Sequence, residues 1–259
     1  MQDQNSQQYH LRSPEELVEI GFSRSRVVMM NEAHNGDIRC IRTRLIGQRL
    51  LPTLHRCGVR HMAMEALDTR TIEEFNRSRN ISGKQAGYYF VHPEMRAFAQ
   101  AALDLGWTLL AYEADPSQEP ANLAERERNN WREEMQARNI FAALNALPSE
   151  ARLFVWCGNS HHSRSTVPLD PGEPDIPWAL MGYHFQQLSG IKHFVIDQTR
   201  TVRFLPRPRP QLDQWLTEHT AELAALGGTA GFLNEEAPAC FRVSDGEDAF
   251  LVSLYNEME

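Results

Sequence analysis

The stretch Val27–His34, with the sequence VVMMNEAH, sets a pattern that recurs along the chain. Its first four residues are apolar, which is typical of a short strand buried on both faces of a sheet. Polar Asn31, Glu32 and His34 follow at the point where such a strand would end. A carboxylate and an imidazole there are poor packing groups but suit proton transfer. The stretch therefore predicts a strand over 26–30 that leads directly into acid–base residues.

Short apolar runs followed by titratable residues occur again further along the sequence. The predicted later strands cover 61–66, 107–112, 153–156, 193–197 and 249–254. The titratable residues at the ends of the first three of these are Glu65, Glu113 and Asp115, and His161 and His162. Because each apolar run ends in groups that are costly to bury unpaired, we expect these groups to have partners or a function.

Helical patterns separate the predicted strands. They cover 14–21, 38–57, 72–75, 93–103, 121–147, 178–188 and 212–226. In the long helix, the residues predicted to face inward are Trp131, Met135, Ile140, Leu144 and Leu147. Alternation of strands and helices predicts an α/β fold, with a mostly parallel central sheet and helices on both of its faces. In such sheets ligands bind outside the carboxyl ends of the strands, so the titratable residues are expected to share one site.

Composition narrows the class of protein. The 259 residues carry 26 Lys and Arg against 34 Asp and Glu, a net charge of −8, which argues against nucleic-acid binding. The start lacks a signal-peptide pattern, no apolar run approaches the roughly 20 residues of a membrane span, and the cysteines form no CxxC pair. We therefore expect a cytoplasmic protein with no membrane partner. We expect a flexible tail over 1–12 and a single domain over 13–259, with 206–259 as a C-terminal extension packed on it.

Several functional interpretations of the polar residues stay open on the sequence alone. His34 could be a loop residue or, with Glu32 orienting it, a general base. Glu65 could form a structural ion pair or serve the site. One member of the pair His161 and His162 is a bystander, because adjacent histidine side chains diverge.

Other reaction types have weaker signals. A metal site built from His34, His161 and Glu32 or Glu65 is conceivable, but the chain has no HExxH or CxxC spacing. No GxSxG elbow, cysteine-nucleophile signature or phosphate-binding glycine loop occurs. The arginines that follow His34 fit a solvated helix face. Attack by a water molecule that a side chain activates is the chemistry that remains.

Five motifs in order resemble the erythromycin esterase-like superfamily, which is related to ChaN-type haem-binding and Tiki-type protease domains. The first two are Asn31-Glu32-Ala33-His34 and Met62-Ala63-Met64-Glu65, similar to the superfamily's Gly-Glu-x-His-like motif and its second strand with a terminal glutamate. The others are the helix segment 132–140, the strand and turn 155–161, and the closing segment 181–196.

This resemblance implies a metal-independent hydrolase that cleaves an ester or related carbonyl bond of a small-molecule substrate. By position, His34 would be the general base, Glu32 and Glu65 would orient and tune it, and His161 would bind the substrate or the developing oxyanion. The predicted substrate-binding residues are Arg39, Glu113, Arg132, Asn139, Asn159 and His162. The haem- and protease-like branches imply an alternative: a haem- or metal-binding protein, possibly a metal-dependent hydrolase or peptidase, with His34, His161, Glu32 and Glu65 as ligands.

Two residues depart from the family pattern. Asn31 stands where the family has glycine, and Gly158 stands where it has histidine. These changes leave the identity of the substrate open.

Overall fold

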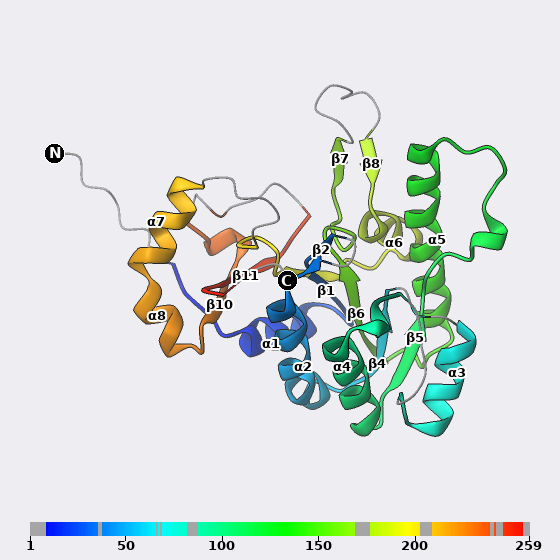
Figure 1. Cartoon of the computed structure of the whole chain (residues 1–259), viewed down its shortest axis with the longest axis horizontal. Helices are drawn as coiled ribbons and strands as arrows, with labels where there is room; N and C mark the ends of the chain where they lie inside the picture. Colours follow the sequence, from blue (N-terminus) through cyan, green and yellow to red (C-terminus); the bar gives the residue numbers. More distant parts are fainter. Residues whose placement is uncertain are drawn as a thin grey trace.

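A computed structural model describes residues 9–35, 38–65, 67, 69–81, 88–168, 177–202, 209–238, 241 and 246–255 (Figure 1). Its centre is a seven-stranded sheet with the strand order β10-β11-β9-β1-β6-β4-β5. The strands are β1 (Val27–Glu32), β4 (Val59–Met64), β5 (Thr108–Ala111), β6 (Arg152–Gly158), β9 (Phe194–Asp197), β10 (Thr229–Leu233) and β11 (Ala249–Ser253). Neighbouring strands run parallel except β10, which is antiparallel to β11. The predicted α/β fold is confirmed.

Helices cover both faces of the sheet. They are α1 (Pro14–Arg24), α2 (Ile41–Arg56), α3 (Thr69–Ser78), α4 (Pro93–Asp104), α5 (Glu125–Asn145), α6 (Met181–Ser189), α7 (Pro210–Glu218) and α8 (Thr220–Ala225). Short 3₁₀ helices among the described residues are η1 (Tyr88–Val91), η2 (Pro116–Gln118) and η3 (Asn234–Glu236).

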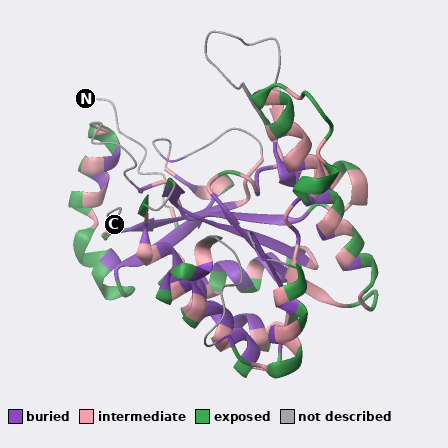
Figure 2. Ribbon diagram, turned by 45° about the vertical axis from the view of Figure 1, so that its right-hand side comes forward, coloured by how far each residue is buried: buried purple, intermediate pink, exposed green. Residues whose placement is uncertain are grey.

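The side chains of β1 alternate between two apolar layers. Val28 and Met30 pack in the layer formed with α1 to α4, whereas Val27 and Met29 pack in the layer formed with α5 and α6. A third apolar cluster joins α7 and α8 to β10 and β11. Figure 2 shows the strands as a buried layer between helices whose outer faces are exposed. A strand with two buried faces explains the unbroken apolar run VVMM.

Several boundaries differ from the sequence-based prediction. The first strand continues to Glu32, because Asn31 and Glu32 find buried hydrogen-bond partners. Trp178 lies in the hairpin of β7 (Thr166–Pro168) and β8 (Pro177–Ala179), so the helix expected from 178 begins at Met181. The helix expected over 212–226 is divided into α7 and α8, and β10 was not predicted.

The inward face of α5 was predicted partly wrongly. Trp131 and Met135 are half-buried, whereas Glu133 and Gln136 are buried. An apolar-periodicity argument assumes that charged residues point to solvent, but buried polar groups are stable when they are paired. Glu133 pairs with His161 and with the N–H of Met181, and Gln136 donates to Glu113.

The first and last described segments of the chain lie beside the edge strand β10. Residues 1–8 of the predicted tail lie outside the described residues, while Arg12 forms a bridge with Gly231 of β10 and the ring of Tyr9 packs on Trp215 and Phe232. In the segment 206–259, β10 and β11 extend the central sheet. Within the described part of the chain, no helix has the length and apolar character needed to span a bilayer.

Candidate functional site

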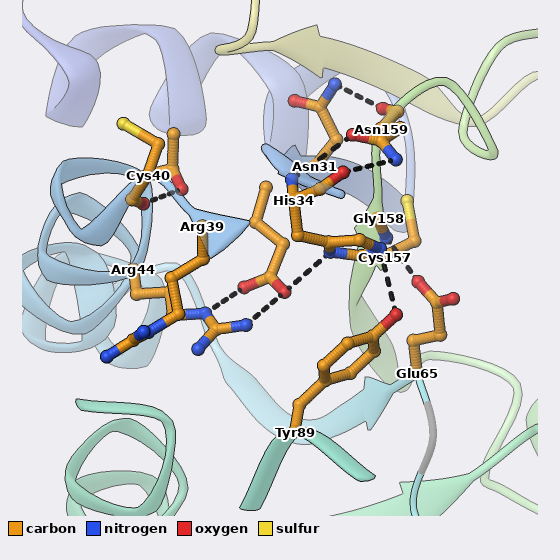
Figure 3. A network of polar contacts seen from close by, with 12 residues as sticks. Asn31, His34, Arg39, Cys40, Arg44, Glu65, Tyr89, Cys157, Gly158 and Asn159 are labelled. Carbon is orange, nitrogen blue, oxygen red and sulfur yellow. Dashed lines mark hydrogen bonds and ion pairs between the residues drawn. The ribbon is translucent and has the colours of Figure 1, made fainter. Parts of the chain in front are cut away.

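Glu32, the last residue of β1, is a buried carboxylate with four donors around it. Arg44 donates from Nε to Oε2 at 2.6 Å and from Nη2 to Oε1 at 2.8 Å, and Trp156 donates from Nε1 to Oε2 at 3.1 Å. The fourth partner is Nδ1 of His34, 3.1 Å from Oε1 (Figure 3). Burial alone would raise the pKa of Glu32, but the hydrogen bonds from His34 and Arg44 outweigh it and lower that pKa. Glu32 is therefore an anion fixed in position.

Arg44 was predicted to lie on a solvated helix face, and this prediction was wrong. Its side chain is fully buried at the start of α2, where it also contacts His92 Nδ1 at 2.9 Å and Glu94 Oε1 at 3.0 Å. A guanidinium is stable there because its planar fork matches the Glu32 carboxylate. Arg39, a predicted substrate contact, forms an ion pair with Glu94 in the same network.

The imidazole of His34 is held at both ring nitrogens. Nδ1 faces the Glu32 carboxylate, which can only accept, so Nδ1 carries a proton and Nε2 has the lone pair when the ring is neutral. Nε2 lies 2.9 Å from the hydroxyl of Tyr89, which the sequence did not single out. The backbone of His34 is clamped by Asn159, whose amide donates to the His34 carbonyl at 3.0 Å and accepts from its N–H at 3.3 Å. Asn159, predicted to bind substrate, thus fixes the loop that carries His34.

Glu65 follows β4 and approaches the His34 ring over Gly158. It accepts a hydrogen bond from the Gly158 N–H and one from Arg132 Nη2 at 3.0 Å. A Cβ atom at position 158 would lie 2.2 Å from His34 Cε1 and 2.8 Å from Glu65 Oε2. Gly158, the position where the family pattern has histidine, therefore lets the two side chains converge on its backbone.

Charge fixes the protonation state of Glu65. Burial alone would raise its pKa, but the positive charges of His161 and Arg132 lower that pKa to about 2. The carboxyl group is therefore ionised throughout the neutral range.

His161 is paired with two carboxylates. Its Nδ1 lies 2.6 Å from Glu133 Oε1, an ion pair without regular hydrogen-bond geometry, and its Nε2 lies 3.9 Å from Glu65 Oε1. Glu133 also accepts the N–H of Met181 at the start of α6, at 2.7 Å. Burial would lower the pKa of His161, but Glu133 and Glu65 raise it to about 9. His161 is therefore an imidazolium at neutral pH.

Arg132 connects Glu65 to Glu113, which follows the end of β5. It donates to Glu113 from Nε at 2.9 Å and from Nη2 at 2.7 Å, and Gln136 donates to the same carboxylate at 3.0 Å. Asn139 donates to the carbonyls of Tyr112 and Glu113 at 3.2 and 3.0 Å. Of these predicted substrate contacts, Asn139 ties α5 to the strand end, Glu113 holds Arg132, and Arg132 has a partly exposed guanidinium.

His162 points into a different environment from His161. Its ring is buried, neither nitrogen has a hydrogen-bond partner within the described residues, and burial lowers its pKa to about 4. The charge that acts on it most strongly is that of Asp197 at the end of β9, a residue that binds Asn31 at 2.7 Å. The structure brings His161, and not His162, together with Glu65.

The four residues proposed as alternative metal ligands do not fit a cation in this arrangement. Glu32 is occupied by the guanidinium of Arg44, and Glu65 by that of Arg132, so a metal ion would face two fixed positive charges. Among the residues that the structure describes, no three His, Cys, Asp or Glu side chains are grouped to hold a metal.

The polar residues beyond the carboxyl ends of the strands form two groups. In one, the anionic Glu32 orients a histidine whose Nε2 is its basic atom. In the other, His161 and Arg132 are cations held by Glu65, Glu133 and Glu113. A base beside fixed positive charges can deprotonate a nucleophile and stabilise negative charge that develops on a carbonyl oxygen.

Comparison with known proteins shows similarity in fold. No family model matches the sequence, and no curated protein matches it. The solved structure of a mutant of erythromycin esterase EreC in its open conformation aligns with a TM-score of 0.59 and 10% identity over 94% of this chain and 97% of that one. A structure described as bacterial protein toxins aligns with a TM-score of 0.51 and 11% identity, and the chain spans 37% of its length. ChaN of Campylobacter jejuni, a heme-binding structure, gives a TM-score of 0.49 and 9% identity. The first two likenesses show a shared α/β fold, and at 10–11% identity they do not extend to activity.

Proposed function

We propose that the chain is a hydrolase in which water attacks the carbonyl carbon of an ester or related bond in a small-molecule substrate, with His34 as the general base. The observation that carries this proposal is the Glu32–His34 pair. A buried carboxylate held by Arg44 binds Nδ1, so the ring keeps its lone pair on Nε2 at the strand-end edge. A fixed tautomer and orientation are what a general base needs.

The reaction would proceed in two steps. In the first, Nε2 of His34 takes a proton from water as the water oxygen bonds to the carbonyl carbon, and Glu32 stabilises the resulting imidazolium. The carbonyl electron pair moves to oxygen, giving an oxyanion. In the second, the oxyanion electron pair re-forms the carbonyl as the carbon–oxygen bond to the leaving group breaks. The leaving oxygen takes that bond's electron pair and the proton from His34, which gives an alcohol and a carboxylic acid.

The oxyanion needs positive charge, and His161 and Arg132 supply it. His161 is protonated at neutral pH, with its pKa raised to about 9 by Glu133 and Glu65 despite burial. Fixed charges cost no reorganisation during the reaction, and removing one such donor typically slows catalysis by about 10²–10³-fold. In this proposal Glu65 positions His161 and Arg132, whereas the resemblance implied that it orients and tunes His34.

The test is a screen of ester and amide substrates with the wild-type protein beside His34→Ala and His161→Ala, with and without a chelator. His34→Ala should lose about 10²–10⁴-fold in turnover while the melting temperature stays within a few degrees. His184→Ala is the matched control, because this half-buried histidine packs on Tyr183 in α6. Equal turnover in wild type and His34→Ala would remove the proposal.

The same screen separates the alternative function. Activity that is lost with a chelator and restored by a divalent metal would favour a metal-dependent hydrolase or peptidase. Haem absorption in the visible spectrum of the purified protein would favour a haem-binding protein.

A further inference from the structure

The hydroxyl of Tyr89 is in hydrogen-bond contact with Nε2 of His34. The hydroxyl lies 2.9 Å from His34 Nε2, and the two ring centroids are 4.6 Å apart (Figure 3). Tyr89 belongs to the short helix η1, which precedes α4. The Arg44 guanidinium lies 5.7 Å from the centre of the tyrosine ring. The same arginine therefore contacts both the carboxylate that orients the base and the ring that covers it.

The direction of this hydrogen bond follows from the other side of the imidazole. Because Glu32 fixes the proton on Nδ1, neutral His34 has only a lone pair at Nε2, so Tyr89 must donate. Burial, together with the negative charges of Glu65 and Glu32, raises the pKa of the Tyr89 phenol well above its usual value. The phenol therefore keeps its proton at neutral pH and remains a hydrogen-bond donor.

A ring nitrogen has a single lone pair, and in this structure the tyrosine proton occupies it. His34 cannot take a proton from water while that hydrogen bond persists. We propose that Tyr89 is a positioning residue that masks His34 in the free protein, and that its hydroxyl must leave Nε2 before a water molecule can be activated. This inference rests on the proposed role of His34 as the base.

As a consequence, His34 can act as a base only after a substrate has moved the Tyr89 hydroxyl away from Nε2. A substrate that displaces the hydroxyl of Tyr89 exposes Nε2 at the moment when a carbonyl group is in place. Until then, Glu32 and Tyr89 together hold the ring in the tautomer that the reaction needs.

Tyr89→Phe tests the masking without any substrate. In protein labelled with ¹⁵N-histidine, the Nε2 resonance of His34 should move towards that of a free, unprotonated ring nitrogen, while Nδ1 stays protonated. Diethyl pyrocarbonate acylates imidazole nitrogens that have an available lone pair. Its rate at His34, measured by mass spectrometry, should rise by about two- to tenfold, the range for one net hydrogen bond.

The controls separate masking from a general change of structure. The exposed His10 is an internal reference for the reagent, and Tyr183→Phe removes a tyrosine hydroxyl from α6. Tyr89→Leu is a second variant that lacks the hydroxyl, should Tyr89→Phe be poorly folded. An unchanged Nε2 resonance with an unchanged or slower acylation of His34 would overturn the proposal.

Turnover gives an independent arm. With a substrate from the screen, Tyr89→Phe should raise kcat/KM, because no hydroxyl has to leave Nε2, whereas an unchanged or lower kcat/KM would overturn masking. If His34 proves not to be the base, the resonance and acylation results still decide whether Tyr89 masks it. Failure of the two proposals is therefore distinguishable.

Discussion

Replacing Gly158 with alanine adds one methyl group at the point where the site converges. In the present backbone, that methyl carbon would lie 2.2 Å from His34 Cε1, 2.7 Å from His34 Nε2 and 2.8 Å from Glu65 Oε2. Carbon atoms in contact prefer about 3.5–4.0 Å, so the His34 ring would have to move by more than about 1 Å. Such a shift would disturb the 3.1 Å contact between Nδ1 and Glu32 Oε1.

The expected result is a large loss of activity with a modest loss of stability. A misplacement of about 1 Å can cost about 10²-fold in rate, so we expect kcat to fall by about that factor or more. Overpacking of this kind typically lowers the free energy of unfolding by about 1–3 kcal/mol. Turnover of an ester found in the screen and urea denaturation measure the two effects separately.

Gly190→Ala is the matched control for stability. Its added methyl group would meet nothing within 4 Å, but its φ of 68° is left-handed, a conformation that costs about 1–2 kcal/mol for alanine. The two variants should therefore be similarly destabilised, and only Gly158→Ala should lose activity. Full activity in Gly158→Ala would refute the geometry that places His34 over this backbone.

Three further predictions concern the charges that fix the two histidines. Arg44→Met leaves the buried Glu32 carboxylate without its cationic partner, so urea denaturation should show that the free energy of unfolding falls by about 3–5 kcal/mol, and a fall below about 1 kcal/mol would contradict the ion pair. Glu133→Gln removes the carboxylate nearest to His161, so its pKa should fall from about 9 in an NMR titration, and an unchanged value would show that Glu133 is not the cause. Because the pKa of His161 is raised in the folded state, from 6.5 to about 9, the stability that it contributes is complete below pH 6.5 and is lost as the pH rises through about 9. The fall should be up to about 3 kcal/mol and absent in His161→Gln, and parallel stability curves for the two proteins would contradict it.

The sequence predicted the sheet and the edge at which polar residues gather, because both follow from local patterns. Apolar runs such as Val27–Met30 are typical of buried strands, and the residues after them must lie at the carboxyl end of a parallel sheet. The convergence of His34, Glu65 and His161 follows from that topology. Their chemical roles stay predictions that the variants above test.

The partners of these residues could not be predicted, because their positions depend on tertiary packing. Arg44 is one of several arginines on α2, and nothing local marks it as the buried one. Glu133 lies on a charged stretch of α5 whose sequence is typical of a solvent-exposed helix, although it accepts a hydrogen bond from the Met181 N–H and forms an ion pair with His161. Tyr89 is on a short 3₁₀ helix without a strand or helix pattern. From the sequence, one could infer only that Glu32 needs a buried cation and His161 a buried anion as partners, and not that these are Arg44 and Glu133.

The most direct test of whether Glu32 and His34 act as one unit is a double-mutant comparison of kcat/KM for His34→Ala, Glu32→Gln and the two changes combined. If Glu32 acts through His34, the double variant should be no slower than His34→Ala, which should itself be about 10²–10⁴-fold slower than wild type. Losses that multiply, or turnover that survives in His34→Ala, would contradict the claim that a carboxylate-held imidazole activates water in this protein.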